Sequence, residues 1–161
     1  MKFRFPIVII DEDFRSENSS GLGIRAMAQA IESEGFEVVG VTSYGDLSQF
    51  AQQQSRASAF ILSIDDEEFT PGPELDPAVL NLRTFIEEVR RKNTEVPIYI
   101  YGETKTSRHL PNDILRELHG FIHMFEDTPE FVARHIIREA KSYLEGIQPP
   151  FFKALLDYAE D

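Results

Sequence analysis

Acidic side chains stand directly after two apolar runs of this sequence. Three consecutive carboxylates, Asp11, Glu12 and Asp13, follow four β-branched residues at positions 7–10, and Asp65 follows a second apolar run. If both runs are strands of one parallel sheet, these carboxylates meet at the same edge, which is where α/β proteins bind ligands. Carboxylate oxygens are preferred ligands of Mg²⁺ and Ca²⁺. Asp11, Glu12 and Asp65 are therefore candidate ligands for a cation, and the same arrangement could accept a phosphoryl group.

The elements that would position these carboxylates alternate between strands and helices. Short runs rich in β-branched and aromatic residues predict five strands, at Ile7–Ile10, Glu37–Val41, Ala59–Ile64, Val96–Tyr101 and Gly120–Phe125. Apolar residues at helical spacing predict helices near Gly21–Glu34, Leu47–Ala51, Val79–Val89, Leu110–Leu118 and Thr128–Glu145. Five such βα units predict an α/β, flavodoxin-like doubly wound parallel sheet of order 2-1-3-4-5, with helices on both faces.

Two helix details are further expectations. Leu22 is expected on the inner face of the first helix, and Phe131 on the inner face of the last. Gly21 and Gly23 open the first helix, but the third glycine of a dinucleotide-binding fingerprint is missing. The two glycines therefore predict a flexible start of this helix rather than a nucleotide site.

Composition restricts the function classes. The chain has 161 residues, no cysteine and a formal net charge of −12. Strong acidity argues against nucleic-acid binding, and no apolar run approaches the ~20 residues of a membrane helix. The lack of cysteine excludes disulfides and thiolate metal sites and, together with an N-terminus that lacks a signal-peptide pattern, favours a cytoplasmic protein. Acidic surfaces repel one another at neutral pH, and this repulsion weakens as carboxylates are protonated.

The fold and the carboxylates resemble response-regulator receiver domains, in which an acidic pair and a third-strand aspartate hold Mg²⁺ and accept a phosphoryl group. The residues that carry this chemistry are replaced here. Ser63 stands at the position of the acceptor aspartate, and Thr104 is the nearest hydroxyl after the fourth strand. After the fifth strand, where a receiver has a lysine, this chain has Met124. Without that lysine the phosphoryl group has no fixed positive charge to pair with. The sequence therefore predicts a receiver fold without phosphotransfer, with the degenerate pocket formed by Asp11, Glu12, Asp13, Ser63, Asp65, Thr104 and Met124.

The end of the chain departs from the five-unit plan. A helix break at 146–150 is followed by Phe151 and Phe152, which begin a new amphipathic segment. These two side chains are expected to dock on a partner surface. We therefore divide the chain into a receiver-like domain, residues 1–146, and the start of a linker, residues 147–161.

Several segments together resemble one enzyme family. The receiver-like domain, Ser-Ser-Gly-Leu-Gly at 19–23 and Pro-Pro-Phe-Phe-Lys-Ala-Leu-Leu-Asp-Tyr at 149–158 are similar to the N-terminal wing region of the bacterial ornithine/lysine/arginine decarboxylases. The segments at 41–46 and 60–65 also look like this family. The arginine decarboxylase branch is favoured.

The resemblance implies a non-catalytic assembly domain. Members of the family use pyridoxal phosphate, and the Schiff-base lysine is expected beyond residue 161, so this chain would hold no catalytic or cofactor-binding residue. Wings of the family pack between dimers and help to build decamers, some of them in acid. The implied partners are the remainder of the decarboxylase chain and neighbouring subunits, with a homo-oligomer as one form.

Two other functions remain open from the residues. One is a free-standing pseudo-receiver that docks a signalling partner through its fourth-strand face, near Tyr99, Tyr101 and the segment 105–109. The other is an atypical receiver that accepts phosphate at Asp65 or Asp11.

Overall fold

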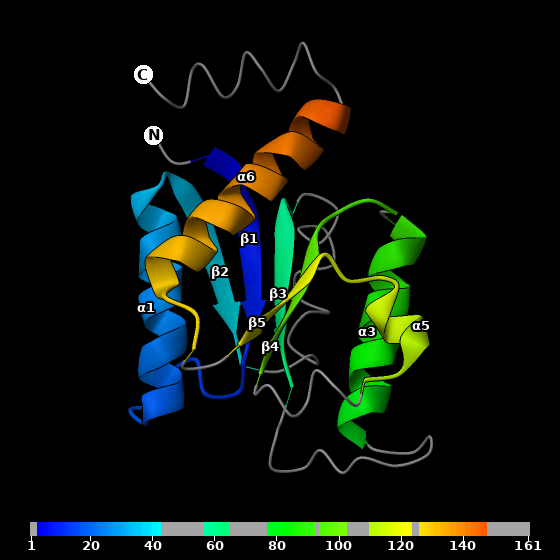
Figure 1. Cartoon of the computed structure of the whole chain (residues 1–161), viewed down its shortest axis with the longest axis horizontal. Helices are drawn as coiled ribbons and strands as arrows, with labels where there is room; N and C mark the ends of the chain where they lie inside the picture. Colours follow the sequence, from blue (N-terminus) through cyan, green and yellow to red (C-terminus); the bar gives the residue numbers. More distant parts are fainter. Residues whose placement is uncertain are drawn as a thin grey trace.

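The sheet has the predicted topology. The computed structural model describes residues 3–42, 57–64, 77–92, 94–102, 110–123 and 126–147. Its strands are β1 (Phe3–Ile10), β2 (Phe36–Val41), β3 (Ala59–Ser63), β4 (Ile98–Gly102) and β5 (Gly120–His123). They form one five-stranded sheet in the order β2-β1-β3-β4-β5, and every neighbouring pair is parallel (Figure 1). The flavodoxin-like fold predicted from the sequence is confirmed.

Helices cover both faces of this sheet. The described helices are α1 (Ser19–Ser33), α3 (Pro77–Lys92), α5 (Asn112–Leu115) and α6 (Pro129–Ile147). Figure 1 shows α1 and α6 on one side of the strands and α3 with α5 on the other. The helix predicted near Leu47–Ala51 lies outside the described residues. Within the described part, no helix combines the length and the apolar character needed to cross a membrane.

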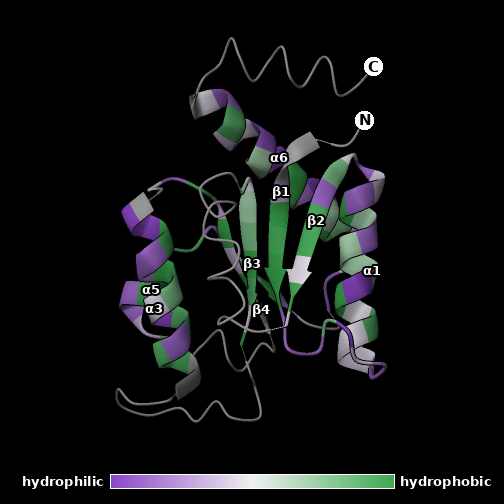
Figure 2. Cartoon of the chain, turned by 180° about the vertical axis from the view of Figure 1, so that it is seen from behind, coloured by the Kyte–Doolittle hydropathy of each residue, from purple (hydrophilic) through white to green (hydrophobic). Residues whose placement is uncertain are grey.

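Strand β1 supplies side chains to both layers of the core. Ile7 and Ile9 pack in a buried cluster with residues of α1 and α6, whereas Val8 and Ile10 pack in a second cluster with residues of α3. Successive residues of a strand point to opposite faces, so a strand covered on both sides has no position for a polar residue. This is why β1 is uniformly apolar from residue 7, and Figure 2 shows its hydrophobic colouring along the strand.

Two residues expected on inner helix faces are exposed instead. Leu22 is 55% exposed and Phe131 is 67% exposed. In α1 the buried stripe passes through Ile24, Met27 and Ile31, and Leu22 lies two residues before Ile24, about 200° away around the helix. Phe131 is likewise on the side of α6 opposite its buried residues, so the sequence prediction is wrong for both side chains.

Salt bridges fasten the short helix α5 to α3. Arg83 Nε lies 2.8 Å from Asp113 Oδ2, and Arg90 Nε lies 2.8 Å from Glu117 Oε2. Arg90 also donates from Nη1 to the carbonyl oxygen of Val96, at 2.9 Å. One guanidinium therefore joins α3, the segment after α5 and the segment before β4.

The first turn of α1 is tightly packed rather than flexible. The side chain of Asn18 caps the helix by accepting a hydrogen bond from the backbone N–H of Gly21, at 2.8 Å. A Cβ atom at Gly21 would overlap the backbone oxygens of Asp13 and Ser16. At Gly23 the nearest atom to such a Cβ would be the Tyr101 hydroxyl oxygen, at 3.4 Å, which is an ordinary contact.

These neighbouring glycines should respond to alanine in opposite ways. We expect Gly21→Ala to lower the free energy of unfolding by about 1–3 kcal/mol, because the backbone oxygens must move to make room. We expect Gly23→Ala to be neutral or to raise it by up to about 1 kcal/mol, because alanine favours a helix interior. Urea unfolding of the two variants beside the parent chain measures both effects. Equal effects at the two positions would contradict the close approach at Gly21.

Candidate functional site

The predicted pocket lies at the carboxyl edge of the sheet. In register, Ile10 pairs with Leu62, and Ser63 pairs with Tyr101, so the ends of β1, β3 and β4 lie side by side. Asp11 follows β1 at this edge, and Ser63 ends β3. The ends of the first and third strands therefore meet at one rim, while the predicted approach of the carboxylates that begin at Asp65 lies outside the described residues. Five predicted site residues lie outside the described residues: Asp65, Thr104, Met124, Phe151 and Phe152.

Asp11 braces the loop that leaves β1. Its side chain is buried, at 3% exposure for the residue. Its Oδ1 accepts a hydrogen bond from the backbone N–H of Asp13 at 2.8 Å, and its carbonyl oxygen accepts one from the N–H of Phe14 at 3.0 Å. The Asp11 N–H donates to the carbonyl oxygen of Val41, at 3.0 Å. A carboxylate used in this way organises the local backbone.

Asp13 is also held by its own loop. Its Oδ1 lies 3.3 Å from the Ser16 hydroxyl and 3.3 Å from the side-chain nitrogen of Asn18, and both donate to it. Asn18 in turn caps α1, so the carboxylate and the cap form one connected unit. Glu12, between the two aspartates, is exposed.

Arg25 closes the same loop from the side of α1. Its Nη1 donates to the carbonyl oxygens of Phe14, at 2.7 Å, and Ser16, at 2.8 Å. The ring of Phe14 packs over Gly40 of β2, where a Cβ atom would overlap it. The loop after β1 is thus fixed to α1 by a guanidinium and to β2 by an aromatic ring.

Tyr101 was not assigned to this rim from the sequence. Its ring lies in the core cluster with α1 and α6, at 5% exposure, and its hydroxyl approaches Gly23. Burial, and then the nearby negative charge of Asp11, raise the pKa of Tyr101 to about 12. The group beside Asp11 is therefore an uncharged phenol, which offers a phosphoryl group no positive charge.

The docking face suggested by the fourth strand is not on the surface. Tyr99 is 2% exposed and Tyr101 is 5% exposed, and both belong to the cluster under α1 and α6. Ile98 and Ile100 face α3 on the other side. Because β4 lies inside the sheet and is covered on both faces, its side chains are not available for docking, and the prediction is wrong for Tyr99 and Tyr101. The alternation of isoleucine and tyrosine in an interior strand was the signal that could have shown it. The segment 105–109, the other part of that predicted face, lies outside the described residues.

The candidate cation ligands are not gathered into a site within the described part of the chain. There, no group of three or more histidine, aspartate or glutamate side chains is close enough to hold a metal ion. Asp11 is committed to the loop backbone, and Asp65 is not described. The described carboxylates of the rim accept hydrogen bonds from their own loop.

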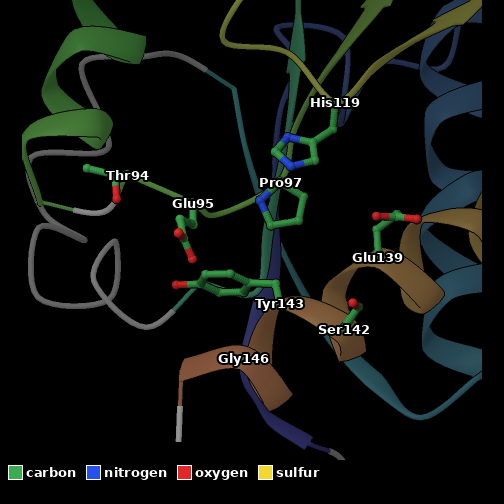
Figure 3. A pocket seen from close by; sticks show the side chains of 8 residues that line it. All are labelled: Thr94, Glu95, Pro97, His119, Glu139, Ser142, Tyr143 and Gly146. Atoms are coloured by element: carbon green, nitrogen blue, oxygen red, sulfur yellow. The ribbon is translucent and has the colours of Figure 1, made fainter.

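A second hollow lies at the opposite end of β4 and β5 and has no counterpart in the sequence predictions. It has a volume of about 400 Å³ and lies between the segment before β4, the start of β5 and the C-terminal half of α6 (Figure 3). Its residues come from segments far apart in the chain, so no local motif marks it. The lining consists of Thr94, Glu95, Pro97, His119, Glu139, Ser142, Tyr143 and Gly146.

Comparison with known proteins decides the family. The model of the Orn/Lys/Arg decarboxylase N-terminal domain matches residues 19–143, most of the chain. The chain belongs to this family. The sequence resemblance to the decarboxylase wing is thereby confirmed.

Relatives of this decarboxylase domain agree in sequence and in structure. Lysine decarboxylase LdcA of Pseudomonas aeruginosa is 27% identical over 158 residues, which cover 96% of this chain and 20% of the relative. Its solved structure superposes with a TM-score of 0.75 at 26% identity, over 96% of this chain and 20% of that chain. The biodegradative arginine decarboxylase of Escherichia coli is 24% identical and again covers 96% of this chain and 20% of the relative. The chain thus spans about a fifth of the length of these relatives.

The receiver likeness concerns the fold alone. A response regulator receiver domain protein from Clostridium thermocellum superposes with a TM-score of 0.57 at 15% identity, over 86% of this chain and 95% of that chain. The decarboxylase domain therefore has the receiver architecture, while its sequence relatives are decarboxylases.

Alkaline unfolding tests the environment of Tyr101 in the decarboxylase domain. The pKa of Tyr101 rises from an ordinary value of 10.0 to about 12 in the folded chain. Between these values the unfolded chain loses the phenol proton while the folded chain keeps it, so the stability that Tyr101 contributes below pH 10 is lost as pH rises. Between these two pH values we expect the free energy of unfolding of Tyr101→Phe to fall less steeply than that of the parent chain, by about 1.4 kcal/mol per pH unit. Urea unfolding of both chains at about pH 9 and about pH 11 measures it, and parallel declines would contradict the assignment.

Phosphoryl transfer to the decarboxylase domain should not occur. The rim combines a loop-bonded Asp11 with an uncharged Tyr101 hydroxyl, and Ser63 stands at the acceptor position. We therefore expect incubation with acetyl phosphate and Mg²⁺ to leave the intact mass unchanged. A phosphoryl-mass adduct that disappears in Asp65→Asn or Asp11→Asn would show an active receiver instead.

Proposed function

We propose that this chain is the non-catalytic N-terminal assembly domain of a pyridoxal-phosphate-dependent decarboxylase that acts on a basic amino acid. The observation that carries the proposal is the family match over residues 19–143. Residues 1–146 would form the wing, and residues 147–161 would begin the linker to the cofactor-binding domain. Phe151 and Phe152 would then dock on the rest of the chain or on a neighbouring subunit.

The described residues do not fit pyridoxal phosphate. The cofactor brings a phosphate group and needs a lysine for its Schiff base. Among the described residues, the lining of the hollow in Figure 3 contains neither lysine nor arginine, and its carboxylates, Glu95 and Glu139, would repel a phosphate. In this proposal the cofactor binds in a part of the parent enzyme that lies outside this chain.

Charge supports an assembly role that depends on pH. The chain carries 28 acidic side chains against 16 lysines and arginines. At neutral pH two copies repel each other, and the repulsion falls as carboxylates take up protons in acid. These properties suit a domain that promotes the assembly of an acid-responsive decarboxylase. The absence of cysteine suits a reducing compartment such as the cytoplasm.

Self-association should therefore increase in acid. We expect sedimentation of the 161-residue chain to show larger species near about pH 5 than near about pH 8, because the loss of negative charge removes repulsion. Salt provides the control: raising the ionic strength at about pH 8 shortens the screening length and should also increase the size. If the sedimenting species have the same size under all three conditions, charge does not regulate self-association.

The linker assignment is tested in the longer protein. If residues 147–161 begin a linker, the reading frame continues past Asp161 into a cofactor-binding domain. We expect the full-length decarboxylase without residues 1–146 to keep its bound cofactor while it sediments as a smaller oligomer. Loss of the cofactor with unchanged oligomer size would contradict an assembly role.

A further inference from the structure

We propose that His119 is a two-position switch at the amino ends of β4 and β5. The uncharged imidazole accepts a hydrogen bond from the backbone of β4, and the protonated imidazole pairs with Glu139 of α6 instead. Both positions lie within one chain, so this inference goes beyond the proposed assembly role and does not depend on it.

The first position is the one that the structure shows. His119 Nδ1 accepts a hydrogen bond from the backbone N–H of Ile98 at 3.4 Å, and the His119 N–H donates to the carbonyl oxygen of Ile98 at 2.8 Å. The imidazole thus serves as an acceptor for β4 just before the first paired residues of the two strands, Tyr99 and Gly120. To accept at Nδ1, the neutral ring must carry its proton on Nε2.

Protonation removes this hydrogen bond. An imidazolium has an N–H donor at both ring nitrogens and no acceptor, so its Nδ1–H and the N–H of Ile98 oppose each other. His119 is exposed to solvent and belongs to neither core cluster. The ring can therefore take up a proton from water and rotate without displacing core side chains.

Glu139 is the carboxylate placed to receive the charged ring. His119, before β5, and Glu139, on α6, line the same hollow (Figure 3). Glu95 lines it too, but the carboxylate whose charge acts on His119 is that of Glu139. Glu139 Oε1 lies 3.9 Å from the Nε of Arg138, a side chain that is 73% exposed. Ion pairs of this exposed kind are weak, so Glu139 can turn toward an imidazolium.

The surrounding charges determine the pH at which His119 switches. Partial burial, and then the charge of Arg90, lower the pKa of His119 from its ordinary value of 6.5, whereas Glu139 raises it. Arg90 is held nearby by Glu117, whose Oε2 lies 2.8 Å from Nε and whose carbonyl oxygen lies 2.9 Å from Nη2. The charged and titratable groups around the switch are Arg90 on α3, Glu117 after α5, Glu95 and Tyr99 on the β4 side, and Glu139 and Arg138 on α6.

The direction of the pH effect follows from the lowered pKa. Tyr99, whose ring lies 6.4 Å from that of His119, stays uncharged because burial raises its pKa. Below the ordinary value of 6.5 the unfolded chain binds the histidine proton before the folded chain does. The stability that His119 contributes is therefore complete above this value and declines as the pH falls through the lower folded pKa. The first position is occupied at neutral pH, and the second in acid.

Nuclear magnetic resonance of the 161-residue chain between about pH 8 and about pH 5 tests the switch. We expect the Nδ1 resonance of His119 and the amide resonance of Ile98 to move together, with one midpoint below 6.5. The protection factor of the Ile98 amide against hydrogen exchange should fall about fivefold to tenfold across this midpoint, because one hydrogen bond is lost. Amides of β1, such as that of Ile9, should keep their protection, which separates the switch from acid unfolding.

Two pairs of variants assign the positions. His119→Asn keeps an acceptor oxygen on a side chain that does not titrate, so the Ile98 amide should no longer respond to pH. His135→Asn removes another ring close to Tyr99 and should leave the Ile98 response unchanged. Glu139→Gln should lower the midpoint of His119, because the charge that favours the imidazolium is gone. Glu130→Gln, an exposed acid in the first turn of the same helix, is the matched control and should not shift it.

Three outcomes would overturn the proposal. They are an Ile98 amide that does not follow His119 or that changes together with Ile9, a His119 midpoint at or above 6.5, and a shift in Glu139→Gln no larger than that in Glu130→Gln. The first two are measured on the parent chain, so they apply even if a variant fails to fold.

Discussion

The burial of β1 on both faces is the constraint on which the rest of the fold depends. Its residues alternate between two separate clusters, one under α1 and α6 and the other under α3. A polar side chain at any position from 7 to 10 would be removed from water without a partner. The first polar residue, Asp11, therefore comes where the strand leaves the sheet. The packing of β1 thus determines where the acidic loop at the carboxyl edge of the sheet begins.

The acidic side chains at this edge bond to the loop that carries them. The oxygens of Asp11 and Asp13 accept hydrogen bonds from their own loop, and Arg25 holds the same loop by its carbonyl oxygens. The acidic side chains are present, but their oxygens accept hydrogen bonds from the loop itself.

The sequence predicted the parts of the structure that depend on periodicity. Five apolar runs and the helices between them are sufficient for strand order, because parallel strands and right-handed crossovers leave few alternatives. The predictions for Leu22 and Phe131 failed because the buried face of a helix is determined by the whole stripe of apolar residues. One large apolar side chain does not define it.

Tyr101 and the hollow beside α6 were missed for a different reason. The position of a phenol beside Asp11 depends on the register between β4 and β3, and the hollow joins residues 94–97 to residues 139–146. Neither relation has a local signature in the chain. The family resemblance, by contrast, depended on short segments of characteristic sequence, which is why it could be stated before the fold was known.

The saturated loop after β1 has a mechanical consequence. Here Asn18 donates to Asp13, and Asp11, Asn18 and Arg25 bond to the backbone around them. Any movement of this loop must therefore break hydrogen bonds that join the end of β1 to the start of α1 and to β2.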